Sequence, residues 1–137
     1  MIYLDASVVV PIFVVEATSP RLDVWLATHP DICLSPWTVA EFSSALSHHQ
    51  RTGRLAPDER EAAEDGLDQW LAQGVRLLDI GNDDVRAART LIRFDPLLRT
   101  PDALHVALAE RFGLSLATYD QRLAASAARI GIEAIQP

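Results

Sequence analysis

Short apolar runs that alternate with segments of helical spacing constrain the fold of this chain more than any other feature. Runs rich in Ile and Leu occur at residues 2–4, 32–34, 75–80, 114–118 and 132–135, and they indicate brief buried strands. Helical patterns lie between them at 7–13, 19–26, 35–53, 57–74, 82–92 and 100–113, with a last short one that reaches Gly131. Parallel strands need a crossover that is usually a helix. We therefore predict an α/β fold with a central parallel sheet of four to five short strands and helices on both faces.

Several of the predicted helices carry start signals. Ser35 followed by Pro36 suits the N-cap and the first helical position, and Thr100 followed by Pro101 repeats the pattern. Asn82 is predicted to cap the helix that follows it. The helix after Pro101 is apolar nearly all round, so we expect it to be buried.

Size and charge bound the possible classes of protein. The 137 residues have the usual size of one compact domain, and we expect a single domain over residues 1–137. Hydrophobic residues make up 49% of the chain, too many for disorder. Nineteen acidic and twelve basic residues give a net charge of -7, which provides no general attraction to nucleic acid or to an anionic membrane. Any contact with nucleic acid must be local or bridged by cations.

The absence of lysine and the single cysteine exclude further classes of protein. All twelve basic residues are arginine, so a P-loop lysine and Schiff-base catalysis are impossible. Cys33 is the only cysteine, which excludes an intrachain disulfide and a cysteine-rich zinc site and fits a reducing compartment. The first residues carry neither a basic start nor a long apolar run. We therefore expect a cytoplasmic protein without a membrane association.

Four acidic residues stand apart from the others by position. Asp5 and Asp120 follow predicted strands. Asp102 lies at the second position of a helix, and Glu41 lies inside another helix. Ligands of α/β proteins bind beyond the carboxyl ends of the strands, so we expect Asp5 and Asp120 at a functional edge. A carboxylate cluster without a histidine or cysteine pattern suits Mg²⁺ or Mn²⁺, which can activate water at a phosphodiester.

Ordinary structural roles remain open for these acids. Asp5 and Asp120 can be helix N-caps, and the helix dipole favours Asp102 at a helix start. Glu41 lies on a mostly apolar helix face, where an unpaired carboxylate is costly and a cation would be favourable.

Four segments carry a resemblance to a known family. They are IYLDAS at 2–7, Glu41 in the third helix, LRTPDALHVA at 98–107 and TYDQRL at 118–123. In this order and context the chain resembles PIN-domain proteins, and in particular the VapC toxins of type II toxin–antitoxin systems. The matching acids of that family form a Mg²⁺-dependent ribonuclease site. The resemblance implies this metal-binding and catalytic role for Asp5, Glu41, Asp102 and Asp120, with Ser7 and Thr118 as polar residues that support them.

The same resemblance implies partners. They are an RNA substrate, for which transfer RNA is a candidate, and a VapB-like antitoxin that assembles with a homodimer into a heterotetramer or a larger complex. Tyr119 departs from the family pattern, because a small residue is expected between Thr118 and Asp120. A non-catalytic PIN-fold module that binds RNA or protein is the alternative. A phosphorylated receiver-like domain is a weaker one, since its usual lysine is absent.

Other residues receive structural interpretations. His105, three residues after Asp102, is interpreted as a packed or hydrogen-bonded histidine. His48 and His49 end a helix, where cations suit the dipole. Trp37 could stack on a base but is interpreted as a core or interface residue. An apolar set either packs the domain core or the homodimer or receives an antitoxin helix. It comprises Val8, Val9, Ile12 and Phe13 beside Leu22, Trp25 and Leu26.

Overall fold

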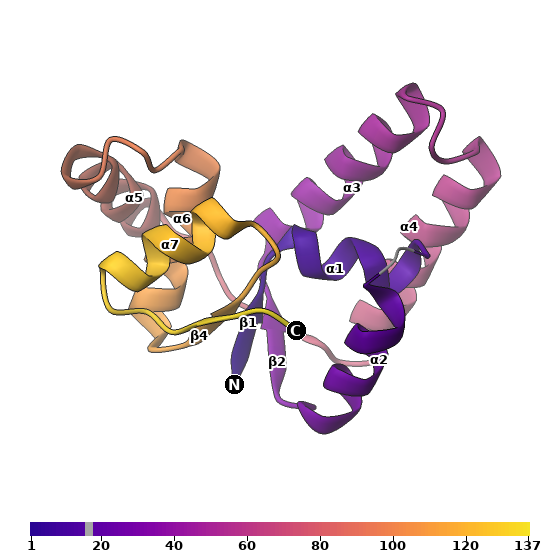
Figure 1. Ribbon diagram of the computed structural model, residues 1–137, viewed down its shortest axis with the longest axis horizontal. Helices are drawn as coiled ribbons and strands as arrows, with labels where there is room; N and C mark the ends of the chain where they lie inside the picture. The colour runs from indigo at the N-terminus through magenta and orange to yellow at the C-terminus, as the bar shows by residue number, and fades with distance from the viewer. Residues whose placement is uncertain (16–17) are drawn as a thin grey trace.

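The computed structural model describes residues 1–15 and 18–137, and its centre is a five-stranded sheet. Every pairing in the sheet is parallel, in the order β3-β2-β1-β4-β5, which confirms the predicted α/β class (Figure 1). The strands are β1 (Ile2–Leu4), β2 (Ile32–Leu34), β3 (Arg76–Leu77), β4 (Ser115–Ala117) and β5 (Ala134–Ile135). The edge strands β3 and β5 are shorter than predicted, because each pairs with a single neighbour over two residues.

The helices follow the predicted pattern closely. They are α1 (Ala6–Phe13), α2 (Ser19–Thr28), α3 (Pro36–Arg51), α4 (Pro57–Ala72), α5 (Asn82–Phe94), α6 (Thr100–Phe112) and α7 (Gln121–Arg129). Two predicted caps are wrong by one residue. Arg99 rather than Thr100 is the N-cap of α6, and Gly81 rather than Asn82 is the N-cap of α5. At α5 the Asp84 carboxylate accepts the Gly81 N–H at 2.7 Å and so satisfies the helix start without an Asn cap.

The direction of the crossovers divides the helices between the two faces of the sheet. From β1 the chain moves outward to β2 and β3, then crosses back to β4 and continues to β5. Parallel crossovers are almost always right-handed, so this reversal places α1–α4 on one face and α5–α7 on the other (Figure 1). The two hydrophobic core clusters are consistent with this division of the helices. Leu4 belongs to the same cluster as Phe42, and Tyr3 belongs to the same cluster as Leu108. The reversal lies between β1 and β4, where α/β folds bind ligands.

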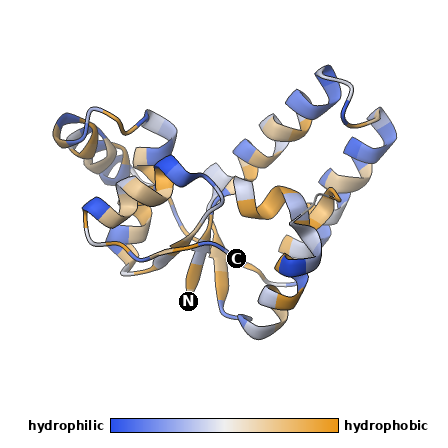
Figure 2. Ribbon diagram, in the orientation of Figure 1, coloured by the Kyte–Doolittle hydropathy of each residue, from blue (hydrophilic) through white to orange (hydrophobic). Residues whose placement is uncertain are grey.

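Helices α3 and α4 form an antiparallel arm that runs away from the sheet (Figure 1). Ser35 caps α3 by accepting the Thr38 N–H at 3.2 Å, as its position before Pro36 predicted. Phe42 and Leu46 are fully buried along the inner part of the helix. The outer end of the arm is hydrophilic (Figure 2). The arm therefore joins a core-packed base to an exposed polar tip.

Much of the apolar set near the start of the chain belongs to the core. Val8, Val9 and Leu22 are buried at no more than 1% exposure, whereas Phe13 is only partly buried and packs edge-on against Phe42. No helix among residues 1–15 and 18–137 is long and apolar enough to span a membrane.

Candidate active site

A cavity of about 500 Å³ brings together the four predicted acids, Asp5, Glu41, Asp102 and Asp120. They come from separate places in the chain, namely the β1–α1 junction, α3, α6 and the loop before α7. Because Asp5 follows β1 and Asp120 follows β4, the cavity lies at the carboxyl edge of the sheet where the crossovers reverse.

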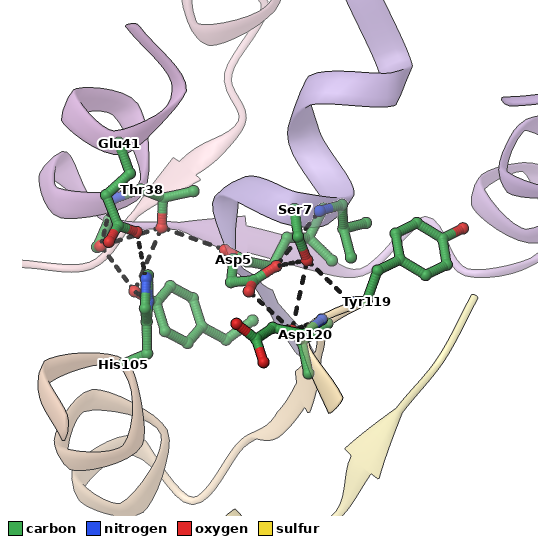
Figure 3. Close-up of polar contacts among 12 residues, drawn as sticks. Asp5, Ser7, Thr38, Glu41, His105, Tyr119 and Asp120 are labelled. Atoms are coloured by element: carbon green, nitrogen blue, oxygen red, sulfur yellow. Dashed lines mark hydrogen bonds and ion pairs between the residues drawn. The ribbon is translucent and has the colours of Figure 1, made fainter. Parts of the chain in front are cut away.

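Asp5 is held by hydroxyl groups on both sides of its carboxylate (Figure 3). Ser7 Oγ donates to Oδ1 at 2.6 Å, and Thr118 Oγ1 donates to Oδ2 at 2.7 Å. Asp5 also caps α1, since Oδ1 accepts the Val8 N–H at 3.3 Å. The two hydroxyls predicted to support the acids therefore both contact Asp5.

Each of these hydroxyls receives a hydrogen bond from the loop after β4. The Tyr119 N–H donates to Ser7 Oγ at 2.8 Å, and the Asp120 N–H donates to Thr118 Oγ1 at 2.9 Å. Because each hydroxyl oxygen accepts from the backbone, its own hydrogen is directed at the Asp5 carboxylate, and such chains strengthen each other. The Tyr119 side chain points away from the acids and its hydroxyl donates to the Pro137 carbonyl at 3.2 Å (Figure 3).

Glu41 contacts a buried histidine. His105 Nε2 and Glu41 Oε2 lie 2.6 Å apart, and His105 Nδ1 lies 2.7 Å from the Tyr3 hydroxyl (Figure 3). The arrangement that satisfies all three groups has Nε2–H donating to the carboxylate and Nδ1 accepting the Tyr3 O–H. The Tyr3 oxygen in turn lies 2.7 Å from Ser35 Oγ and accepts from Thr38 Oγ1 at 3.3 Å.

His105 is the residue whose link to the site the sequence interpretation missed. It is 2% exposed and hydrogen-bonded, as interpreted, but its partner is one of the four acids. The signal was its spacing, because His105 lies three residues after Asp102 and so faces the same side of α6. In place of the cation expected beside Glu41, the structure has the imidazole N–H of His105.

Asp120 is the N-cap of α7, and Asp102 lies in the first turn of α6. Asp120 Oδ1 accepts the N–H groups of Arg122 at 2.8 Å and Leu123 at 3.2 Å, so the helix-cap interpretation holds while the residue also lines the cavity. Asp102 is the third residue of α6, one position later than predicted, because the helix begins at Thr100.

Burial and like charge shape the electrostatics of the cavity. Burial raises the pKa of Asp5, against the opposing effect of the Ser7 hydrogen bond and the nearby His105. Burial also raises the pKa of Asp102, and the charge of Asp120 raises it further. These carboxylates are therefore costly to ionise without a compensating cation.

The donor chemistry fits a hard divalent cation, since four carboxylates line the cavity and the charge on Asp120 would be relieved by an ion beside Asp102. Among the residues that the structure describes, no three carboxylates, imidazoles or thiols converge into a ready-made coordination site. In this arrangement the hydroxyls of Ser7 and Thr118 hold Asp5, and His105 holds Glu41.

Two further residues lie away from the cavity. Trp37 packs against the cluster beneath α5 and α6 and lines a separate apolar pocket, so it does not stack over the acids. Asp84 is a buried acid that the sequence did not single out, and it pairs with Arg111 at 2.5 Å. This ion pair ties α5 to α6 and has a structural role.

A sequence model of the PIN domain matches residues 2–129. The chain belongs to the PIN-domain family. Its curated relatives are VapC-type ribonucleases: it is 34% identical to Ribonuclease VapC46 of Mycobacterium tuberculosis, over 99% of this chain and 97% of that protein. Ribonuclease VapC35 of the same species is 28% identical over 100% of this chain and 97% of that protein.

Solved structures share the fold. The Mycobacterium tuberculosis protein VapC20, described as a Sarcin-Ricin loop cleaving toxin, superposes with a TM-score of 0.73 at 21% identity and covers 100% of both chains. FitAB bound to an IR36 DNA fragment gives a TM-score of 0.77 at 18% identity over 98% of this chain and 94% of that one. These structures place the five-stranded sheet and its helices among PIN folds.

Proposed function

We propose that this PIN-domain protein is a Mg²⁺-dependent endoribonuclease, with Mn²⁺ as a possible substitute, that hydrolyses phosphodiester bonds of RNA. The observation that carries the proposal is the meeting of Asp5, Glu41, Asp102 and Asp120 in one cavity. The ribonuclease names of its curated relatives support the reaction class.

In this proposal the four carboxylates hold the metal. A bound Mg²⁺ would activate water and stabilise the charge that develops on phosphate oxygens. Ser7 and Thr118 fix the orientation of the Asp5 carboxylate. His105 fixes that of Glu41, and the closeness of Asp102 to Asp120 creates the negative field that attracts a cation.

We further propose that the protein is the toxin of a toxin–antitoxin module in the cytoplasm. Its partners would be a VapB-like antitoxin, a second copy of the chain in a homodimer, and a structured RNA such as a transfer RNA. A shallow apolar pocket lined in part by Ile12, Phe13 and Trp70 offers a place for an antitoxin side chain. Ile12 and Phe13 are partly buried members of the apolar set at the start of the chain, whereas Val8 and Val9 are in the core.

Incubation of the purified protein with total RNA, with Mg²⁺ or with EDTA, tests the proposal. We expect metal-dependent fragments from the wild type and none from Asp5→Asn or Asp102→Asn. Asp68→Asn removes an equal charge from an exposed position on α4 and should cut normally. Mapping the cut ends identifies the RNA class. RNA binding without any metal-dependent cutting would instead favour the non-catalytic PIN module.

A further inference from the structure

One face of α3 continues the cavity wall outward from the acids. Glu41, Ser44, His48 and Arg51 all line the cavity. Their spacings of three, four and three residues place them in one row on the helix. At a rise of 1.5 Å per residue, Arg51 lies roughly 15 Å along the axis from Glu41.

The charge along this row changes sign from base to tip. Glu41 at the base belongs to the acid cluster, whereas Arg51 is the only arginine or lysine among the described residues that line the cavity. Within residues 1–15 and 18–137, no ion pair involves Arg51, and its side chain is exposed. The helix dipole favours a cation anywhere around the last turn. It does not explain why this cation faces the cavity.

The polar and basic side chains of this row are suited to contact a polyanionic substrate. The net charge of the chain is -7, so the protein as a whole repels RNA. A metal would offset that repulsion at the acids, but the strand beyond the cut bond still needs contacts to its phosphates. A guanidinium binds phosphate with paired N–H donors, and hydroxyl and imidazole groups also donate to phosphate oxygens.

We propose that Ser44, His48 and Arg51 form a phosphate-binding track for the RNA strand that leaves the cleavage site, an inference that rests on the proposed ribonuclease function. The roughly 15 Å from Glu41 to Arg51 corresponds to about four stacked nucleotides at 3.4 Å each. Phosphate contacts position a strand without reading its bases. The track therefore sets how much single-stranded RNA must enter the cavity, whereas sequence choice depends on other contacts.

Salt-dependent binding tests the track without relying on cleavage. The probe is a short fluorescein-labelled single-stranded RNA of mixed sequence, titrated by fluorescence anisotropy in millimolar Mg²⁺, with Asp102→Asn as the common background so that the RNA stays intact. Arg51→Gln should lower the slope of log K against log salt by about 0.7, the value for one phosphate contact on a single strand. Arg51→Lys keeps the charge and should retain the slope.

Arg54→Gln is the matched control, because Arg54 is exposed just beyond the end of α3 and does not line the cavity. An equal loss of slope in Arg51→Gln and Arg54→Gln would show a general charge effect and overturn the track, as would an unchanged slope in Arg51→Gln. In the otherwise wild-type protein, Arg51→Gln should raise KM and leave kcat nearly unchanged. A wild type that cuts no RNA, combined with the Arg51-specific slope, would refute the nuclease and leave the track standing.

Discussion

His105 Nε2 and Glu41 Oε2 are 2.6 Å apart and join helices that lie on opposite faces of the sheet. The same imidazole reaches Tyr3 on β1 through its other nitrogen at 2.7 Å. The orientation of Glu41 thus depends on α6 and on the central strand as well as on its own helix.

Tyr3→Phe should destabilise the protein by about 1–2 kcal/mol, because the buried His105 Nδ1 would lose its donor and Ser35 and Thr38 would lose a partner. Tyr119→Phe is the control, since its hydroxyl makes one contact with the Pro137 carbonyl and its loss should cost less than about 0.5 kcal/mol. Urea denaturation of both variants measures the difference. Equal stability of the two variants would mean that the Tyr3 contact contributes nothing.

Thr118→Val should cost about 1–3 kcal/mol in the free energy of unfolding, because Asp5 Oδ2 and the Asp120 N–H both lose their partner. RNA cleavage should fall with it, since Asp5 loses its fixed orientation. Thr90→Val on the exposed face of α5 is the control and should change stability by less than about 0.5 kcal/mol. The prediction fails if Thr118→Val unfolds at the same denaturant concentration as the control.

Asp102→Asn should stabilise the metal-free protein at neutral pH. Burial and then the charge of Asp120 raise the pKa of Asp102, so the stability of the folded state falls as pH rises through that raised pKa. The variant avoids this loss, and its advantage should vanish near the ordinary aspartate pKa of about 4. Denaturation in EDTA across this pH range gives the profile.

Asp95→Asn should change stability in the opposite direction to Asp102→Asn. A hydrogen bond from Arg129 is the main cause that lowers the pKa of Asp95, so its stabilising effect is present at neutral pH and disappears as pH falls through that lowered pKa. Asp95→Asn should therefore destabilise at neutral pH, with the difference shrinking in acid. Parallel profiles for the two variants would contradict the assignment of Asp102 to a like-charged cluster.

Mn²⁺ or Mg²⁺ should raise the melting temperature of the wild type, because a ligand that binds only the folded state stabilises it, by about 2.7 kcal/mol at a hundredfold excess over Kd. Asp102→Asn should lose most of that shift, and Asp68→Asn should keep it. Differential scanning fluorimetry with increasing Mn²⁺ measures the shifts in melting temperature. The same titration with Ca²⁺ tests whether a metal can bind the site without supporting RNA cleavage. An unchanged melting temperature in every metal would remove the basis for a metal site.

Sequence patterns predicted the elements well because the signals are local. The run 2–4 followed by Asp5, and the Ser35-Pro36 start of α3, specify a strand and a helix within a few residues. Helix ends were less predictable, as Gly81 shows, because a cap can be supplied by a carboxylate three residues later.

Partners across the fold could not be predicted from local signals. Asp84 and Glu41 are both acids on helices, yet one pairs with Arg111 and the other with His105 in the cavity. In sequence they differ only in their surroundings, since Glu41 lies on a mostly apolar helix face and Asp84 follows Asp83 in a charged helix start. The family resemblance gave Glu41 its expected role in the site, whereas the hydroxyl contacts to Asp5 appear only when β1 and β4 are paired.

The pairing of β1 with β4 also sets when the site can exist. Thr118 and Asp5 are 113 residues apart in the chain, so their hydrogen bond forms only after all the residues between them have been made. A growing chain on the ribosome carries Asp5 and Glu41 long before Asp102 and Asp120 emerge. Contacts of such long sequence separation also form late in folding. The proposed nuclease therefore cannot reach its RNA-cutting form until the ribosome has passed Asp120, and a nascent chain that carries only Asp5 and Glu41 has no site with which to attack the message that encodes it.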